Sequence, residues 1–265
     1  MPVFPVIRIG RERESQPRGE LRAPGRACGV RDAEAVYQPR APERVTEGRP
    51  GGRVRRRGPP EPQRADLVAA LGETTGVGAL ERTRRKMLAS KEGRSVMNHR
   101  PRIGEPTLRG LADLPENTFG GSYWKFMSRR GFSPDERPPV RFVDDEELAY
   151  VATRYREVHD FWHVVFDCPT TILGELALKT VEYQQTGLPM CALSVAGGQL
   201  RLTGEDRRIL FRHYLPWAFK AARRCDHLMS IEYERYFDKD LVECREEWGV
   251  VVCPKRKAFL TSEKR

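Results

Sequence analysis

Large apolar side chains recur with the period of an α-helix between residues 144 and 166, and this run constrains the fold more than any other feature of the sequence. Spacings of three, four and seven residues place on one helix face Leu148, Val151, Tyr155, Trp162 and Phe166. Asp144 and Glu147 have the spacing of a capping box, so the helix should begin there. It should end near Pro169, because proline cannot continue a helix.

A second helix should follow directly. Thr170 or Thr171 can cap its N-terminus, and Gly187 with Pro189 should end it. Its apolar positions are Ile172, Leu176 and Tyr183. Because the link between the two helices is so short, the sequence predicts an antiparallel helical hairpin.

The segments before the hairpin are less regular. Residues 66–88 have a helical pattern that residues 72–76 interrupt with two glycines, so we expect a helix, a turn and a second helix. Residues 100–140 contain six prolines, and only 123–127 looks helical. A loop-rich wrapping region is expected there.

After the hairpin, residues 183–200 carry no charge, but their glycines and proline make them too broken for a membrane-spanning helix. We expect a loop there, either buried or acting as an interfacial lid. Thr203 and Asp206 form another capping box, for a helix that Pro216 must kink or split. Residues 230–248 should complete the helical set.

Few stretches alternate with period two, so the predicted fold class is all-α. We expect a single helical domain over residues 65–250 and a polar tail over 251–265. Residues 1–64 contain 10 Pro, 8 Gly and no Lys. Since such a composition cannot bury enough surface to offset chain entropy, this Arg/Pro/Gly-rich N-terminal segment is predicted to be disordered.

The net charge of +10 lies mostly in that N-terminal segment, where 15 Arg stand against 8 acidic residues. The arginines of residues 53–57 have no interleaved aromatic side chains for base stacking, so we expect no nucleic-acid partner. The acidic residues and prolines also argue against a mitochondrial transit peptide. The six cysteines never approach a Cys-x-x-Cys spacing, which disfavours thiol metal ribbons and disulfide frameworks and favours a reducing compartment.

The residues most suggestive of chemistry lie in the predicted hairpin. His159 and His163 are one helical turn apart, on the face that carries the apolar stripe. Glu175 follows His163 by twelve residues. At about 1.5 Å per residue, it should lie level with His163 across the hairpin.

Two imidazoles and a carboxylate in an apolar environment are ligands that zinc and non-haem iron share. Asp160 can ligate from the flank or can hold an imidazole N–H as an outer partner. The spacing also resembles the His-Glu-x-x-His helix of zinc peptidases, with Asp160 at the position of the general base. A hydrolase is disfavoured because Asp is one methylene shorter than Glu.

These residues resemble the hallmark of the ubiquinone (coenzyme Q) biosynthesis protein 4 family, which is His-Asp-x-x-His, eleven residues, then Glu. That motif falls on His159, Asp160, His163 and Glu175. Further similar segments are 71–76, 141–150, 154–156, 187–190 and 215–218. The resemblance covers about residues 65–250, whereas residues 1–64 differ from the cleavable presequence of the family.

The resemblance implies an all-α protein attached peripherally to the matrix side of the mitochondrial inner membrane, within a multi-enzyme complex that makes ubiquinone. It implies a carboxy-lyase that removes the C1 carboxyl from a polyprenylated 4-hydroxybenzoate, of the 4-hydroxy-3-methoxy-5-polyprenylbenzoate type. The four motif residues would be metal ligands, with zinc as the usual ion. Coupled C1 hydroxylation and a homodimer both stay open.

Our mechanistic hypothesis is that the ion on His159, His163, Glu175 and Asp160 binds the substrate carboxylate or the adjacent ring oxygens as a Lewis acid and orienting template. Oxidative chemistry would favour Fe²⁺ over Zn²⁺ on the same ligands. Candidates for the general acid are Glu73, Tyr155 and Asp160. Apolar positions expected to receive the ring and the prenyl tail are Trp162, Phe166, Leu176 and residues 183–200.

The alternative function is a non-catalytic, lipid-binding scaffold that organises the other biosynthetic enzymes. In that case the metal would brace the hairpin.

Overall fold

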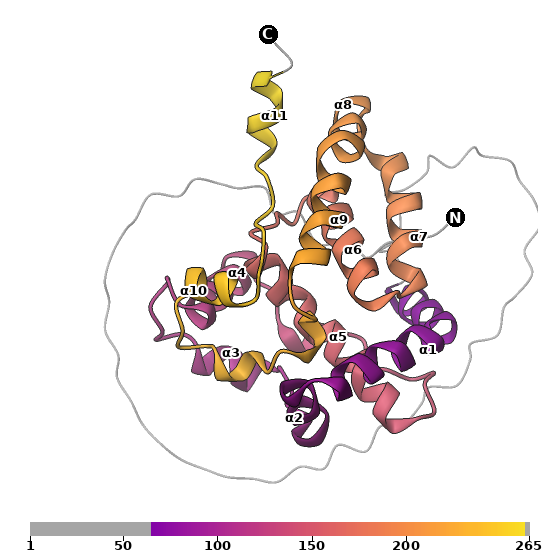
Figure 1. The fold of residues 1–265 in the computed structure, drawn as a ribbon, viewed down its shortest axis with the longest axis vertical. Coiled ribbons are helices and arrows are strands. Elements are labelled where there is room, and N and C mark those ends of the chain that lie inside the picture. Colours follow the sequence, from indigo (N-terminus) through magenta and orange to yellow (C-terminus); the bar gives the residue numbers. More distant parts are fainter. Residues whose placement is uncertain (1–64, 263–265) are drawn as a thin grey trace, which may run out of the picture. The chain divides into compact units, whose positions relative to one another are not determined.

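The structure, a computed structural model, describes residues 65–262 and is all-α, as the sequence predicts (Figure 1). No strand occurs among these residues. The disorder predicted for residues 1–64 concerns a segment outside the described residues.

The helices are named here in chain order. They are α1 (Ala65–Ala89), α2 (Lys91–His99), α3 (Glu105–Gly110), α4 (Phe119–Arg130), α5 (Glu146–Val165), α6 (Ile172–Thr186), α7 (Pro189–Gly198), α8 (Gly204–Ile209), α9 (Leu215–Arg224), α10 (Leu241–Glu247) and α11 (Arg256–Ser262). Short 3₁₀ turns cover Pro134–Glu136, Gln199–Arg201, Leu228–Ser230 and Tyr233–Arg235, and a π-helical turn covers Leu210–Tyr214.

Helix α5 is the central element, and its apolar stripe is buried throughout, as predicted. Its N-cap is Asp145, one residue later than expected, whose carboxylate accepts from the Leu148 N–H at 2.9 Å. At the other end, Asp167 takes the left-handed conformation (φ 49°). The Cys168 N–H then donates to the His163 carbonyl at 2.9 Å, which closes the last turn as a Schellman motif does.

Helix α6 begins at the end of the short link. Of the two threonines considered as its cap, Thr171 is the one used, because its hydroxyl accepts from the Gly174 N–H at 3.2 Å. Gly187, at φ 71°, ends the helix in the left-handed conformation that glycine tolerates best.

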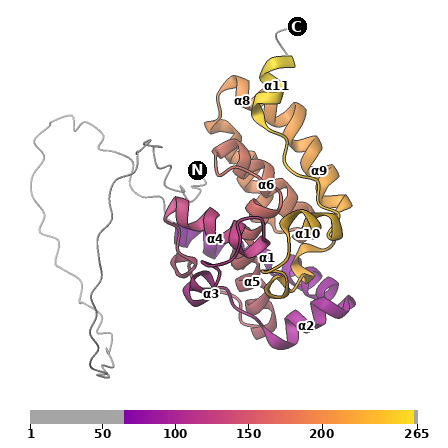
Figure 2. The same ribbon diagram turned by 90° about the vertical axis from the view of Figure 1, so that its left-hand side faces the viewer.

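The two helices form a wider pair than the predicted hairpin. Helix α6 packs mainly on α7 and α9, whereas α5 packs on α1 and α4 (Figures 1 and 2). Long polar side chains make contacts between α5 and α6. Tyr155 and His159, earlier in α5, contact Glu182 near the end of α6, whereas His163, later in α5, contacts Glu175 near the start of α6. The two helices therefore run antiparallel, as predicted, but polar side chains lie between their backbones.

An aromatic core lies on the opposite side of α5. Phe161 packs edge-on against Phe119 and Tyr123 of α4, with ring centroids 5.2 and 4.5 Å apart. Tyr233 and Trp248 continue the same cluster. Helix α5 therefore carries the core on one side and polar side chains on the other.

The turn predicted within residues 72–76 is wrong, because α1 runs through it as one helix. Its glycines allow close approach of α7. A Cβ on Gly72 would lie 2.9 Å from the Met190 Sδ, and one on Gly76 would lie 3.1 Å from Leu188. The packing requirement for a small residue outweighs the weak helix propensity of glycine.

The loop or lid predicted for residues 183–200 is also wrong. Helix α6 extends to Thr186, and after a two-residue break α7 covers Pro189–Gly198 with proline in its first turn. Proline is well tolerated there because the N–H it lacks has no partner within the helix. Cys191, Ser194 and Gly198 form the buried face of α7.

The C-terminal third follows the prediction in part. Thr203 caps α8 as expected, accepting from the Asp206 N–H at 3.1 Å, and Pro216 lies in the first turn of α9, directly after the π-helical turn. Residues 230–248 are less helical than predicted, since only α10 and short turns occur there. In the expected polar tail, Cys253 is buried and its N–H donates to the Phe166 carbonyl at 2.7 Å.

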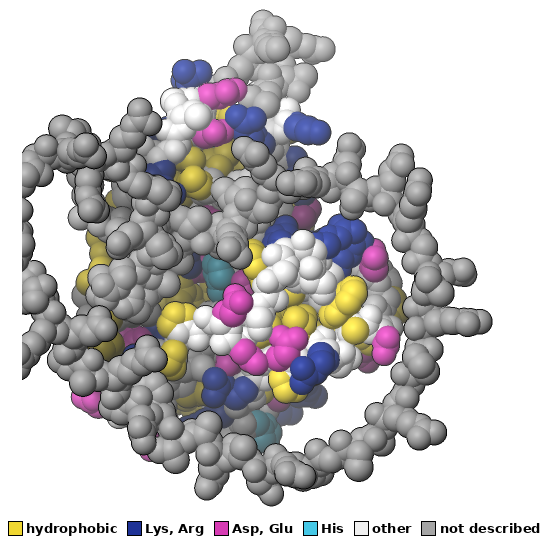
Figure 3. Space-filling view, turned by 180° about the vertical axis from the view of Figure 1, so that it is seen from behind, with side chains coloured by type: hydrophobic (Ala, Val, Ile, Leu, Met, Phe, Trp, Pro, Cys, Tyr) yellow, Lys and Arg dark blue, Asp and Glu magenta, His cyan; other side chains and the backbone are white. Residues whose placement is uncertain are grey.

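Across residues 65–262, no helix is long and apolar enough to cross a membrane. On the face shown in Figure 3, basic and acidic side chains alternate with hydrophobic ones over the described part of the surface.

Gly174→Ala should destabilise the α5–α6 link. Its Cβ would lie 2.1 Å from the Pro169 carbonyl oxygen, so backbone would have to move. We expect the free energy of unfolding to fall by about 1–3 kcal/mol, measured by urea denaturation. Gly78→Ala is the control, since its Cβ would meet nothing closer than an Arg82 nitrogen at 3.6 Å, and it should stabilise by up to about 1 kcal/mol. Equal effects of the two changes would contradict this packing argument.

Candidate metal centre between α5 and α6

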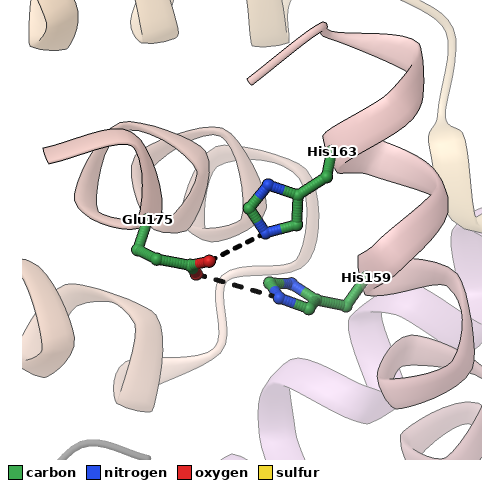
Figure 4. A group of neighbouring side chains, drawn as sticks. All are labelled: His159, His163 and Glu175. Carbon is green, nitrogen blue, oxygen red and sulfur yellow. Dashed lines mark ion pairs between the residues drawn. The ribbon is translucent and has the colours of Figure 1, made fainter. Parts of the chain in front are cut away.

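Three of the predicted site residues meet between the two helices. His159 and His163 project from successive turns of α5, and Glu175 reaches toward both from the first turn of α6 (Figure 4). Glu175 Oε1 lies 3.0 Å from His163 Nε2, and Glu175 Oε2 lies 3.9 Å from His159 Nε2. One ligand atom from each residue lies within 4.8 Å of the others.

The other nitrogen of each imidazole is held by the protein. His159 Nδ1 lies 2.8 Å from a Glu182 oxygen, and His163 Nδ1 lies 3.0 Å from the Cys168 carbonyl oxygen. Because a carbonyl or an ionised carboxylate can only accept, both Nδ1 atoms carry the proton. Both Nε2 atoms then direct their lone pairs at the same space, an arrangement typical of metal-bound histidines.

Two atoms at the centre of this group lack ordinary partners. His163 Nε2 and Glu175 Oε1 are buried, and despite their 3.0 Å separation neither has a partner with hydrogen-bond geometry. Tetrahedral zinc with bonds of about 2.0–2.1 Å would separate its ligand atoms by roughly 3.3 Å. The two Glu175 oxygens lie 3.0 and 3.9 Å from the two Nε2 atoms, and one ligand atom of each residue lies within 4.8 Å of the others, so small side-chain shifts would bring all three residues around one divalent ion.

Glu182 is the hub of the polar cluster and is fully buried. Besides His159, its carboxylate accepts from the Tyr155 hydroxyl and from Lys179 Nζ at 2.7 Å. Cys191 Sγ also lies 3.5 Å from it. The imidazole of His159 is therefore oriented by a carboxylate that is itself fixed from several directions.

Burial alone would raise the carboxyl pKa values and lower the imidazole pKa, but the neighbouring charges outweigh it. The pKa of Glu182 lies well below its usual range, because Lys179 and His159 offset the effect of burial. Likewise the contact with Glu175 raises the pKa of His163, while His163 lowers that of Glu175. Without an ion, the charge of Glu175 thus favours a proton on His163, and a bound ion would replace that proton at Nε2.

Asp160 is not brought into this group. Its carboxylate lies 2.7 Å from an Arg137 guanidinium nitrogen, which in turn is close to the Tyr123 hydroxyl. The arrangement assigns Asp160 to the flank of α5, paired with a cation, so its role as a ligand stays a prediction. The same pairing offers no support for Asp160 as a peptidase-like general base.

Other expected residues lie in different places. Glu73 is held by the Arg141 and Phe142 N–H groups and by Arg156, away from the histidines. Tyr155 touches the cluster through Glu182. Trp162 and Phe166, expected to receive the substrate, are fully buried, with the Trp162 indole donating to Tyr233 at 3.0 Å.

Glu182 and Lys179 were missed by the sequence argument. Both lie on the same face of α6 as Glu175: Lys179 follows it by four residues and Glu182 by seven. This spacing was a usable signal, because charged residues at i, i+4 and i+7 of a helix share one side.

Glu182→Gln should weaken zinc binding about 10- to 100-fold, because loss of the charged acceptor loosens the His159 imidazole. Competition with a chromophoric chelator measures the affinity. Glu157→Gln is the matched control, since Glu157 is an equally buried carboxylate of α5 that binds Arg102 and the Ile103 N–H instead. Unchanged affinity in Glu182→Gln would show that the hub does not orient the site.

Comparison with known proteins identifies the relatives of this chain. Residues 59–254 match the family described as coenzyme Q (ubiquinone) biosynthesis protein Coq4. A Culex quinquefasciatus protein named ubiquinone biosynthesis protein COQ4 homolog 1, mitochondrial, is 48% identical over 71% of this chain and 69% of its own length. The Bos taurus COQ4 homolog, also named mitochondrial, is 44% identical over 74% of this chain and 75% of its own.

A solved structure shares the fold. It is a crystal structure of a Nostoc punctiforme protein provisionally named as a ubiquinone biosynthesis protein, with a TM-score of 0.57 and 21% sequence identity. The similarity covers 69% of this chain and 87% of the other.

Proposed function

The chain belongs to the coenzyme Q (ubiquinone) biosynthesis protein Coq4 family, and we propose that it is a metal-dependent carboxy-lyase of that biosynthesis. The substrate is a polyprenylated 4-hydroxybenzoate that loses its C1 carboxyl. The observation that supports the proposal is the convergence of two oriented Nε2 atoms and a carboxylate with one buried oxygen on one space between α5 and α6.

Zn²⁺ bound there would supply Lewis acidity toward the substrate carboxylate or the adjacent ring oxygens, and Fe²⁺ is the alternative if C1 hydroxylation is coupled. His159 and His163 would hold the ion through Nε2, and Glu175 through its carboxylate. Asp160 is retained in this proposal as a ligand or flanking partner. Its pairing with Arg137 favours the flanking role.

The remaining groups of the cluster orient the imidazoles and limit the access of water to them. Glu182 and the Cys168 carbonyl keep both imidazoles in the tautomer that frees Nε2. Of the three general-acid candidates we favour Tyr155, since Glu73 and Asp160 are held by arginines elsewhere. Lys179 Nζ lies 3.2 Å from the Tyr155 hydroxyl and is partly exposed. Lys179 therefore links the hydroxyl proton of the buried Tyr155 to the surface.

The proposed location is the mitochondrion, following the names of the relatives, on the matrix side of the inner membrane. Partners in this proposal are the other ubiquinone biosynthesis enzymes in one complex. Peripheral attachment is proposed through residues 183–219, where several large apolar side chains are exposed. They are Tyr183, Leu193, Leu200, Phe211 and Phe219.

Leu193→Glu with Leu200→Glu should reduce co-sedimentation with phospholipid vesicles. The two side chains are 47% and 73% exposed, so a charge there leaves the fold intact while removing apolar surface that could enter the interface. Val242→Glu, also exposed, on α10, is the control. Equal sedimentation of all three proteins would exclude this surface as the attachment site.

His163→Ala should abolish decarboxylation and lower the metal content, because two remaining protein ligands hold zinc poorly. Removing the metal from the unaltered protein with a chelator should have the same effect, and added zinc should restore turnover. Turnover is measured as carbon dioxide released from a short-chain polyprenyl hydroxybenzoate. Full activity without metal would overturn the proposed mechanism.

The competing proposal is a non-catalytic scaffold. The His163→Ala variant distinguishes the scaffold from the enzyme. If the chain is an enzyme, His163→Ala loses turnover while the biosynthetic complex still assembles. If the chain is a scaffold braced by metal, the variant loses assembly, and the unaltered protein shows no turnover of its own.

A further inference from the structure

His163 also lines a cavity that no other residue of the polar cluster lines. This cavity of about 540 Å³ opens between the C-terminal half of α4, the end of α5 with its link to α6, α10 and residues 254–256. Its size is in the range of small-molecule sites. Phe126 forms part of its wall and stacks on the His163 ring, with centroids 5.6 Å apart.

The cavity is strongly basic. Its lining includes six cationic side chains and only two acidic ones, Glu116 and Asp167. The six cations are Lys125, Arg129, Arg130, Arg245, Lys255 and Arg256. A cavity with this surplus of positive charge concentrates anions.

Half of these cations are already paired with carboxylates. Lys125 pairs with Glu116, Lys255 with Asp167, and Arg256 with Asp206. Arg129, Arg130 and Arg245 have no carboxylate within ion-pair distance among the described residues. These three guanidinium groups therefore make no direct ion pair, although Glu116 attracts Arg129, and Asp167 and Asp240 attract Arg245, over longer distances.

Two of the three are nevertheless held in place by uncharged groups. Arg130 donates to the Phe126 carbonyl at 3.0 Å and to the Thr170 hydroxyl at 3.3 Å, and its guanidinium lies 4.1 Å above the Phe126 ring. Arg245 donates to the Val165 and Val164 carbonyls at 2.8 and 2.9 Å. Each keeps one terminal nitrogen free of these hydrogen bonds.

Desolvation lowers the pKa of both Arg130 and Arg245; the charge of Arg129 adds to this for Arg130, and Asp167 and Asp240 offset it only in part for Arg245. Binding an anion would relieve that cost. The hydrogen bonds of Arg130 and Arg245 hold their guanidinium groups in place before an anion binds, so these two side chains would lose little conformational freedom on binding.

We propose that this cavity binds a phosphate group through Arg129, Arg130 and Arg245. Phosphate is favoured because its oxygens accept several hydrogen bonds at once, matching planar guanidinium donors that approach from α4 and α10. The apolar side chains beside them, among them Phe126, Leu173 and Leu241, suit a ligand that carries a non-polar part. The phosphate comes from a soluble phosphorylated compound or from a phospholipid headgroup.

Titration calorimetry of the full chain with inorganic pyrophosphate tests the soluble source. The lipid source is tested by sedimentation with phosphatidylcholine vesicles, with and without phosphatidic acid. Arg130→Gln and Arg129→Gln should each weaken binding about tenfold or more, because each removes a charge-assisted hydrogen bond. Arg130→Lys should lie between, since it keeps the charge and loses the planar fork.

Arg223→Gln, an exposed arginine of α9 outside the cavity, is the matched control and should bind as the unaltered protein does. Arg129 makes no hydrogen bond to the fold among the described residues, so Arg129→Gln stays informative if Arg130→Gln unfolds. Binding of pyrophosphate, or of phosphatidic acid vesicles alone, that depends on Arg129 and Arg130 supports the site and identifies the source. No binding to either probe, or equal weakening in Arg223→Gln, overturns it and leaves these arginines as partners of helix C-termini.

Discussion

The candidate metal centre depends first on how α5 ends, because this ending positions both His163 and Glu175. The Cys168 N–H donates to the His163 carbonyl, and the His163 imidazole donates back to the Cys168 carbonyl. The left-handed conformation of Asp167 makes this exchange feasible, because it turns the chain directly after the last helical turn. The same few residues thus stop the helix, orient one imidazole and start the link that delivers Glu175.

The second constraint is the polar content of the space between α5 and α6. A carboxylate, an ammonium group and two imidazoles that are mostly removed from water each need a partner, and Glu182 supplies one to His159, Tyr155 and Lys179. These long side chains keep the two helices apart, so the packing of α6 is taken over by α7 and α9. Glycines at 72 and 76 then let α1 approach α7. The need of these polar groups for hydrogen-bond partners therefore determines both the site and the arrangement of the surrounding helices.

The site was predictable to the extent that it follows from helical periodicity. His159, His163 and Glu175 could be placed together because His163 and Glu175 each lie within about one turn of the short link and His159 lies one turn before His163. Asp160 could not be placed, since its pairing with Arg137 joins segments 23 residues apart. The expected turn at residues 72–76 and the loop at 183–200 failed for a related reason: glycine and proline break helices locally, but contacts with Met190 and Leu188 and a proline in a first turn let the helices continue.

We propose that His159, His163 and Glu175 together hold one divalent ion. X-ray absorption at the zinc edge of the zinc-loaded protein tests it most directly, because nitrogen, oxygen and sulfur ligands differ in bond length. If these three residues hold the ion, the spectrum should show one ion per chain, with two imidazoles and only nitrogen and oxygen neighbours at about 2.0–2.1 Å. Sulfur neighbours at about 2.3 Å, as the buried thiols of Cys168 and Cys253 would supply, or failure to retain zinc, would contradict it.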